Sequence, residues 1–343
     1  MHGSRRQHYP EAALYTKVPL IARQTMLFTL GTFHERRGDQ FLVQSSSPFT
    51  NRSVSLGGLG SLSPGSPQVA STFWGRTYGQ QLEQRWAGPL SPEFSGHMIA
   101  AQIGADLVEF EAGAHTDHAG VFYAFSDTDG EGRGFIRAVD RAVAGNLNMN
   151  SHNIGAYWTH IGPSQWYVDA VLMGTFFNTD TRSTRGIAAN LHGDGITASI
   201  EAGVPVRFTP YLTLEAQGQL IWQRLQFEPA SDPFTTLKFG LDDSFIGRFG
   251  LRLEGETLLN GVRIQPFVQA NLWRAFGGTD STVFNDVFTL PTTFEGTSLE
   301  ISGGVTARLT DRFGVYARGS YGTNVGGAFR ETIGGQLGLR ATW

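Results

Sequence analysis

The chain contains no cysteine among its 343 residues, and no apolar run approaches the ~20 residues that a membrane-spanning helix requires. Without cysteine it can form neither disulfides nor metal–thiolate sites. Its 26 basic and 30 acidic side chains give a net charge of -4 and a pI near 6.1, which offers no electrostatic basis for binding nucleic acid. The sequence therefore predicts no helical membrane anchor and no nucleic-acid partner.

Strict alternation of apolar and polar residues is what the sequence has instead. From Tyr211 to Gln223 the apolar residues fall on one face of an extended strand and Thr, Glu and Gln on the other, with Ile221 the exception. Segments 245–254, 298–310 and 332–343 alternate in the same way. Two faces this different indicate lipid outside and water inside. The alternative, a soluble β-sandwich binding module, is disfavoured by the aromatic residues at strand ends, which resemble the girdles of membrane barrels.

Twelve segments of this kind follow one another through most of the chain. They lie near 71–86, 94–108, 117–127, 149–161, 165–178, 195–208, 211–227, 242–255, 262–275, 297–309, 313–324 and 332–343. Tight turns at 162–164, 209–210 and 310–312 alternate with long polar links at 127–148, 179–194, 228–241 and 276–296, which we expect to be outer loops; the first outer link, 87–93, is short. The sequence thus predicts an all-β fold: a twelve-stranded antiparallel transmembrane β-barrel over residues 71–343, in the outer membrane of a Gram-negative bacterium.

The region before the barrel differs from it. Residues 18–30 are typical of a helix with Pro19 in its first turn, and the helix is expected to continue through residues 33–37. About 20 residues at ~1.5 Å each match the thickness of a hydrocarbon core. Such a helix would nevertheless be costly in lipid. Its charged residues are Arg23, Glu35, Arg36 and Arg37. We therefore predict an N-terminal α-helix in the barrel lumen, within a linker of residues 11–43.

The remaining segments outside the barrel carry no periodic pattern. Residues 44–70 are rich in Ser, Gly and Pro and are expected to form a flexible segment. The first residues, MHGSRR, are followed by polar residues and Pro10, without the apolar core of a signal peptide. An outer-membrane protein must cross the inner membrane, so we expect the chain to be the C-terminal piece of a longer precursor. Residues 1–10 are expected to be a disordered tail or a cloning remnant.

Charged residues recur on the polar faces of the predicted strands. We expect them to line the lumen, to keep it wet and to pair with Glu35, Arg36 and Arg37 of the helix. The predicted lumen-lining residues are Arg76, Glu201, Glu215, Arg248, Arg252, Glu300, Arg308 and Arg340.

Motifs that could carry other chemistry are weak. In the sequence His115-Thr116-Asp117-His118 two imidazoles and a carboxylate lie close, but residues i and i+3 of a strand point to opposite faces, so a polar periplasmic turn is the favoured interpretation. The glycines of 57–60 follow no strand, and the serines of 61–66 have no partnered histidine, so neither a phosphate loop nor a hydrolase is indicated. Acidic residues of the expected outer loops could bind cations or simply be solvated. These are Asp127, Asp129, Glu131, Asp232, Asp242 and Asp243.

Several motifs in order resemble one known family. They include residues 18–40, Phe73-Trp74-Gly75-Arg76, residues 154–160 with 166–170, residues 247–252 and the final 338–343. The chain resembles the C-terminal translocator β-domain of type Va autotransporters, of the pertactin-like kind. The resemblance implies a barrel that carries an N-terminal passenger to the cell surface and anchors it, with an α-helix plugging the pore afterwards. The passenger is not in this chain, so its activity cannot be read here.

The resemblance also implies partners and an assembly signal. Gln336, Gly338 and Trp343 fit the family's terminal signal, which the barrel-assembly machinery reads, whereas Ala341 stands where a larger apolar residue is usual. The other implied partners are periplasmic chaperones, outer-membrane lipid and lipopolysaccharide, and the chain's own passenger. The chain has no Asn-Asn step, so cleavage of the passenger by asparagine cyclisation is not expected.

We therefore expect a monomeric translocator domain, not an enzyme, with no catalytic residue, cofactor or metal. The alternative is a stand-alone outer-membrane pore or a surface barrel hydrolase. An open pore would need no upstream helix, and a hydrolase would need a Ser or Asp clustered with His at outer strand ends, which the sequence does not supply.

Overall fold

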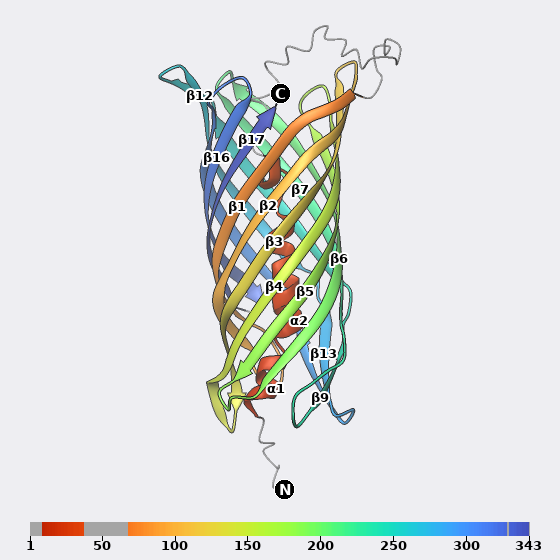
Figure 1. The fold of residues 1–343 in the computed structure, drawn as a ribbon. Helices are drawn as coiled ribbons and strands as arrows, with labels where there is room; N and C mark the ends of the chain where they lie inside the picture. Colours follow the sequence, from red (N-terminus) through yellow and green to blue (C-terminus); the bar gives the residue numbers. More distant parts are fainter. Residues whose placement is uncertain (1–8, 38–67, 328, 343) are drawn as a thin grey trace, which may run out of the picture.

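Twelve long antiparallel strands form a closed barrel in this computed structural model, which describes residues 9–37, 68–327 and 329–342 (Figure 1). The barrel strands are β1 (Gln68–Arg85), β2 (Glu93–Ala112), β3 (His115–Ile136), β4 (Val139–Ile161), β5 (Tyr167–Ser183), β6 (Ala188–Thr209), β7 (Leu212–Phe227), β10 (Ser244–Gly255), β12 (Val262–Ala275), β15 (Gly296–Arg308), β16 (Phe313–Gly327) and β17 (Arg330–Thr342). Strand β17 pairs with β1 from Thr72↔Thr342 to Gln84↔Arg330. Neither strand keeps a free edge, as a barrel in lipid requires. The prediction of a twelve-stranded antiparallel barrel is confirmed.

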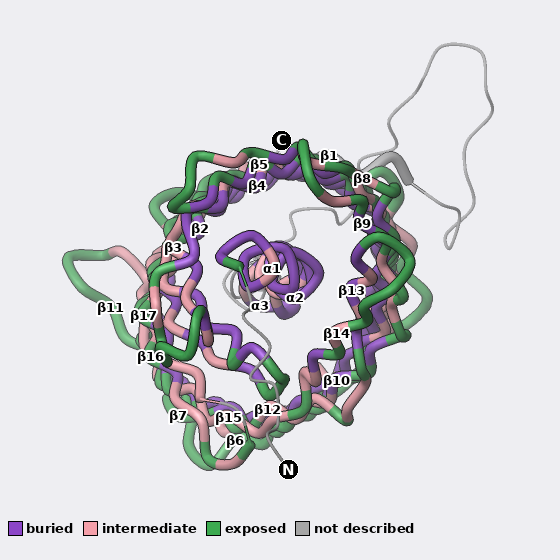
Figure 2. The backbone as a smooth tube through the Cα atoms, turned by 90° about the horizontal axis from the view of Figure 1, so that it is seen from below, coloured by how far each residue is buried: buried purple, intermediate pink, exposed green. Residues whose placement is uncertain are grey.

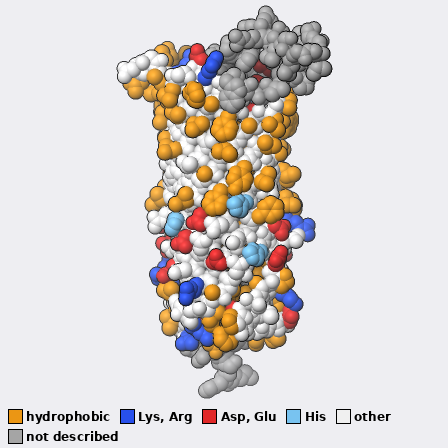
Figure 3. All heavy atoms as spheres, in the orientation of Figure 1, with side chains coloured by type: hydrophobic (Ala, Val, Ile, Leu, Met, Phe, Trp, Pro, Cys, Tyr) orange, Lys and Arg blue, Asp and Glu red, His pale blue; other side chains and the backbone are white. Residues whose placement is uncertain are grey.

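The outer face of the wall is apolar in a broad belt. Ile99, Ile154, Leu172, Ile200 and Leu220 point outward and are 52–61% exposed. In Figure 3 the hydrophobic side chains gather on the upper part of the barrel, and charged ones are more frequent on the lower part. The upper end carries the short turns and the end of β17, so it is the periplasmic end, and the lower end is the outer one (Figure 1).

Two of the expected long outer loops are strands instead. The β3–β4 ladder continues to Ile136↔Val139, so residues 127–148 form a long hairpin closed by Arg137 and Ala138, both with positive φ. Residues 179–194 likewise belong mainly to β5 and β6, with a connection at 184–187. The prediction of long loops was wrong here. Polar residues on the outer face indicate contact with water, but a β-ladder can continue into water beyond the lipid, so they do not mark the end of a strand.

The other two long links contain short strands. These are β8 (Ala230–Ser231), β9 (Thr236–Gly240), β13 (Thr279–Phe284) and β14 (Phe288–Thr293), which form a second sheet in the order β14-β13-β9-β8. An isolated bridge joins Thr293 to Ala87 of the first outer link. The short β11 (Thr257–Leu259) extends the periplasmic turn before β12. The second sheet therefore continues the wall at the outer end.

A helix broken into three parts runs along the barrel axis, inside the ring of strands (Figure 2). The parts are α1 (Pro10–Tyr15), α2 (Val18–Leu30) and α3 (Phe33–Arg37). The second break occurs at Gly31, where φ is +62° and a Cβ would crowd the Arg76 guanidinium. No helix in the described ranges has the length and apolar character needed to cross a membrane.

Some expectations concern residues that the structure does not describe. The residues concerned are 1–8 of the expected N-terminal tail, the segment 38–67 with its glycine and serine motifs, and Trp343. The side chain of Arg37 is also outside the described set. The helix begins at Pro10, one residue before the expected linker, and β1 begins at Gln68, three residues before the expected barrel.

Candidate functional site: the plugged lumen

The outer half of the lumen is an apolar core. Leu14, Ile21, Met26 and Leu30 of the helices are fully buried. They belong to one cluster with inward-facing wall residues, among them Phe94, Leu147, Phe177 and Leu225. The expectation of a wet lumen is therefore wrong for this half. The helix needs apolar partners for its own apolar side chains, and burying each leucine-sized side chain contributes roughly 1.5–3 kcal/mol.

One lysine lies within this core, between α1 and α2. Lys17 is fully buried, and its Nζ donates to the carbonyl oxygen of Ala13. Its side chain lies against Gly132. The neighbours of Gly132 that face outward are the charged Glu131 and Arg133, so this level of the barrel lies outside the apolar belt. Burial lowers the pKa of Lys17 to about 7, and the carboxylate of Glu93 opposes that shift in part. The neutral amine is therefore accessible near physiological pH.

On one side, α3 is held by carboxylates of the wall. Arg36 forms an ion pair with Asp169 of β5, and each side chain is only 1% exposed. The Nε2 atom of His34 lies 2.7 Å from a carboxylate oxygen of Glu215 on β7. The backbone N–H of Phe33 donates to Glu201 of β6 at 3.0 Å. Three neighbouring strands thus each offer one carboxylate to one turn of helix.

The opposite wall binds the same turn. Arg318 of β16 forms an ion pair with Glu35, and the Tyr316 hydroxyl donates to the carbonyl oxygen of Glu35 at 2.8 Å. Gln336 of β17 donates to the same carbonyl. Arg76 of β1 donates to the carbonyl oxygen of Thr29, at the end of α2, at 2.9 Å. The helix is therefore fixed across the full width of the lumen.

At the outer end, three links tie the helix to connections between strands. Arg23 forms a bidentate pair with Asp280 of β13, at 2.9 and 2.7 Å. The Tyr15 hydroxyl donates to Asp232, between β8 and β9, at 2.8 Å. Glu11 accepts a hydrogen bond from Ser183 at 2.6 Å. The connections at the outer end of the barrel therefore close onto the helix.

The residues expected to line the lumen divide into two groups. Arg76, Glu201 and Glu215 contact the helix directly, as described above. The others contact wall residues. Arg248 lies 2.9 Å from Glu201, and Arg252 lies over the Phe267 ring beside Glu254. Glu300 accepts from Arg318 at 2.8 Å, Arg308 contacts Asp311 of a periplasmic turn at 2.8 Å, and Arg340 lies 3.9 Å from Asp106.

The expected pairing of Glu35 and Arg36 with residues of this set was wrong. Their partners are Arg318 and Asp169, which were not among the predicted lumen-lining residues, and Asp280 was missed as the partner of Arg23. Asp169 was detectable, because it occupies a polar position between Val168 and Ala170 in an alternating strand. Asp280 was not, since it lies in a link that was read as a loop.

The terminal strand β17 closes the barrel by pairing with β1, and it also contributes side chains to the lumen. Gln336 points inward to the helix, and Gly338 lies directly under the Tyr316 ring, which a Cβ at this position would overlap. Gly203 lies in the same way under Tyr167. Glycine at these positions lets an aromatic ring from the adjacent strand lie flat on the wall. The Tyr316 hydroxyl then reaches the helix, whereas the Tyr167 ring stacks on Phe33 and its hydroxyl donates to Glu201 at 2.8 Å.

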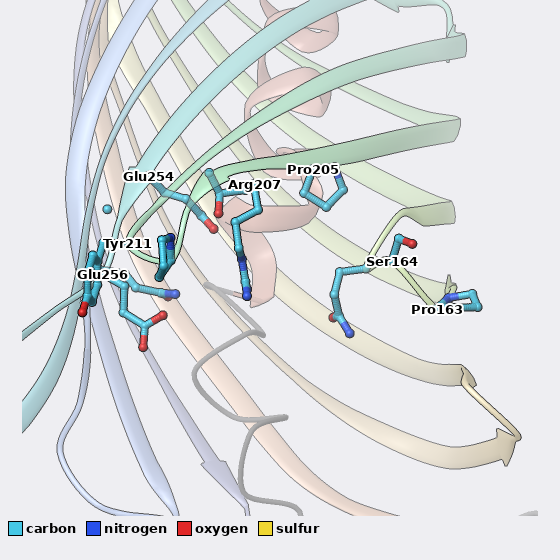
Figure 4. A pocket seen from close by; sticks show the side chains of 12 residues that line it. Pro163, Ser164, Pro205, Arg207, Tyr211, Glu254 and Glu256 are labelled. Atoms are coloured by element: carbon cyan, nitrogen blue, oxygen red, sulfur yellow. The ribbon is translucent and has the colours of Figure 1, made fainter.

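The periplasmic mouth has a cavity of about 340 Å³ (Figure 4). Pro205, Arg207, Thr213 and Glu254 line it together with turn residues such as Ser164. Its charges of both signs are those of a wet entrance. This end is therefore the part of the lumen that keeps the predicted polar character.

No three His, Asp or Glu side chains in the described part of the chain gather as a metal cage. His118 faces the lumen, with Nδ1 3.9 Å from Asp106, whereas Asp117 contacts His160 of β4. Of the acidic residues expected in outer loops, three lie in β3 instead: Asp127, Asp129 and Glu131. Asp232 contacts Tyr15, and Asp242 contacts both Arg23 and Thr279 of β13. Asp243 accepts from the Trp222 indole at 3.0 Å.

A closed twelve-stranded barrel around a bound internal helix has clear relatives. The family model described as the autotransporter β-domain matches residues 73–341. The chain belongs to this family. It is 28% identical to the pertactin autotransporter of Bordetella bronchiseptica over 284 residues, which cover 80% of this chain and 29% of that protein. It is 26% identical to the adhesin/invasin TibA of Escherichia coli over 232 residues, which cover 64% and 22%. The chain thus spans less than a third of the curated relatives that it matches.

Solved autotransporter barrels share the fold. The β-domain of the Bordetella autotransporter BrkA matches with a TM-score of 0.60 at 17% identity, over 80% of this chain and all of that one. The transport unit of AIDA-I from Escherichia coli matches with a TM-score of 0.66 at 16% identity, over 79% and 90%. The predictions of an autotransporter translocator β-domain and of an outer-membrane location are confirmed.

Proposed function

We propose that this autotransporter β-domain leads an N-terminal passenger out through the lumen and then keeps helices α1–α3 there as its plug and anchor. The direction of the helix carries the proposal. Helix α1 lies at the outer end of the barrel (Figure 1), and Tyr9 just before it is 52% exposed. Helix α3 lies deeper, beside β1 and β5–β7. Any segment preceding Tyr9 would therefore leave at the cell surface.

The wall of the barrel supports a set of proposed partners during assembly and in the membrane. The closing β1–β17 ladder would be formed with the barrel-assembly machinery, after periplasmic chaperones have kept the apolar belt from aggregating. The belt would contact outer-membrane lipid, and the charged outer part of the wall would contact lipopolysaccharide. Since β1 and β17 pair with each other, neither keeps an edge that a second copy could extend, and the domain would act as a monomer.

The proposal includes no catalytic step, cofactor or nucleic acid. The buried acidic groups of the lumen, Asp169, Glu201 and Glu215, bind the helix, so they are engaged in holding a plug. The same contacts weigh against an open stand-alone pore and against a surface hydrolase.

Two measurements test this function. A reporter protein fused before residue 1 should become accessible to added protease on intact cells, and a Leu220→Asp variant of the belt should abolish its display. In planar bilayers, deletion of residues 10–37 should raise the conductance severalfold, because it removes the plug. A reporter that stays inside folded, membrane-inserted barrels would reject the translocator role, and an unchanged small conductance would reject the plug.

A further inference from the structure

A cluster of imidazole and indole rings lies on the outward face of β3 and β4, close to their periplasmic ends. The Nδ1 atom of His115 and the Nε2 atom of His160 are 3.2 Å apart. The Nδ1 atom of His160 lies 2.9 Å from Asp117, whose same carboxylate oxygen accepts the Trp158 indole N–H at 3.0 Å. The Trp166 ring covers the cluster from the β4–β5 turn, with its centroid 5.3 Å from that of His160.

The hydrogen bonds fix the tautomer of His160. A carboxylate only accepts, so Nδ1 of His160 must carry the proton that is donated to Asp117. Its Nε2 atom then presents a lone pair toward His115, which donates its own Nδ1–H in the metal-free state. The arrangement of carboxylate, imidazole and free ring nitrogen is the one in which an outer carboxylate orients a metal-bound histidine.

We propose that His115 and His160 bind a divalent first-row transition metal ion such as Zn²⁺ or Cu²⁺ on the periplasmic rim of the barrel. Metal–nitrogen bonds of about 2.0–2.1 Å and a nitrogen separation of 3.2 Å enclose an angle of about 100° at the metal, close to tetrahedral. A small rotation of each ring directs both lone pairs at the metal, and His115 moves its proton from Nδ1 to Nε2. Water completes the coordination.

The site is open to solvent, and only one of its two ligands belongs to the sequence motif of residues 115–118. The side chains of His160 and Asp117 are 22% and 27% exposed, so an ion and its waters can approach. Within the motif, His118 faces the lumen and cannot take part. The second ligand comes from the neighbouring strand, 45 residues away in sequence. The bound metal would join β3 to β4 where their ladder ends.

A fluorescence titration of the full, detergent-folded chain with Cu²⁺ tests the proposal. Bound Cu²⁺ should quench Trp158 and Trp166, whose rings contact the two histidines. His160→Ala should weaken this quenching titration at least tenfold, and Asp117→Asn should weaken it about 10- to 100-fold by releasing the ring. His192→Ala, which removes an exposed imidazole of β6, is the matched control and should change nothing. His2 is present in all variants, so their differences report on this site.

A second measurement uses Zn²⁺ and the unfolding temperature. Zn²⁺ should raise the temperature of the heat-modifiable gel shift for the parent and His192→Ala, and leave it unchanged for a His115→Ala/His160→Ala double variant. The variants must show the folded gel position before the titration. Equal Cu²⁺ quenching by the parent and by the folded double variant would overturn the proposal, and so would an equal Zn²⁺ effect on both.

Discussion

Arg23 of α2 and Asp280 of β13 form a bidentate ion pair although 257 residues separate them, and their side chains are 4% and 2% exposed. The guanidinium also lies over the Phe294 ring, 4.5 Å from its centroid. Because both charges are buried, each loses its charge partner when the other is removed. Without the helix, Asp280 would lose the guanidinium that pairs with it, so the outer hairpin and the plug hold each other closed.

Removing this carboxylate should release the plug. We expect Asp280→Ala to destabilise the seated helix by about 3–5 kcal/mol, because it leaves the Arg23 charge buried and unpaired. Trypsin cleavage after Lys17 or Arg23 in the folded barrel should then become at least about a hundredfold faster. The matched control is Asp286→Ala, which removes an exposed pair with Lys238 at 2.8 Å and should cost about 0–1 kcal/mol. Equal cleavage of both variants would show that the pair does not hold the plug.

The two faces of the terminal strand should respond differently to the same substitution. Gly338→Val must displace the Tyr316 ring and with it the hydrogen bond to α3, which we expect to cost about 1–3 kcal/mol. Gly335→Val places its side chain on the outer face, where the nearest atom to a Cβ is 3.7 Å away, and should be nearly neutral. The unfolding temperature of refolded barrels measures this. If both variants lost the same stability, the ring contact would not matter.

A cation should be tolerated on one face of β7 and not on the other. Leu214 points to the lipid, and the adjacent Thr213 faces the periplasmic cavity beside Glu254. We expect Leu214→Arg to reduce folding into bilayers by roughly 1–3 kcal/mol, since it lies between the midplane and the interface, and Thr213→Arg to have little effect. Urea titrations of barrels in vesicles give both values. A larger loss for Thr213→Arg would reverse the assignment of the two faces.

The buried amine of Lys17 should make plug stability depend on pH. Its folded-state pKa of about 7 lies below the ordinary 10.5, so the folded state is penalised in full below pH 7 and the penalty disappears as the pH rises toward 10.5. Lys17→Met should therefore stabilise the barrel at pH 6, and this advantage should shrink by about 3 kcal/mol at pH 9. Lys238→Met, at an exposed position, is the control. An advantage that does not change with pH would show that Lys17 keeps its ordinary pKa.

The alternation of the sequence was enough to predict the wall and its two faces. In β7 the positions of Glu215, Gln217 and Gln219 are buried and Leu220 is exposed, as period 2 requires. The helix was predictable from its own residues, and its place in the lumen followed from Arg23 and Arg36, which lipid would not accept. These features depend on neighbours in sequence and on the contrast between lipid and water, so a single strand or helix already contains them.

Contacts across the lumen were decided only by the tertiary structure. That Arg36 meets Asp169 and Arg23 meets Asp280 depends on the register of twelve strands and on the depth of the helix, which no local pattern specifies. The apolar outer half of the lumen arose because inward wall residues such as Phe94 surround the helix at that depth. The pairing of His115 with His160 likewise required two strands to lie side by side, since the sequence fixes which face a side chain takes but not what it meets there.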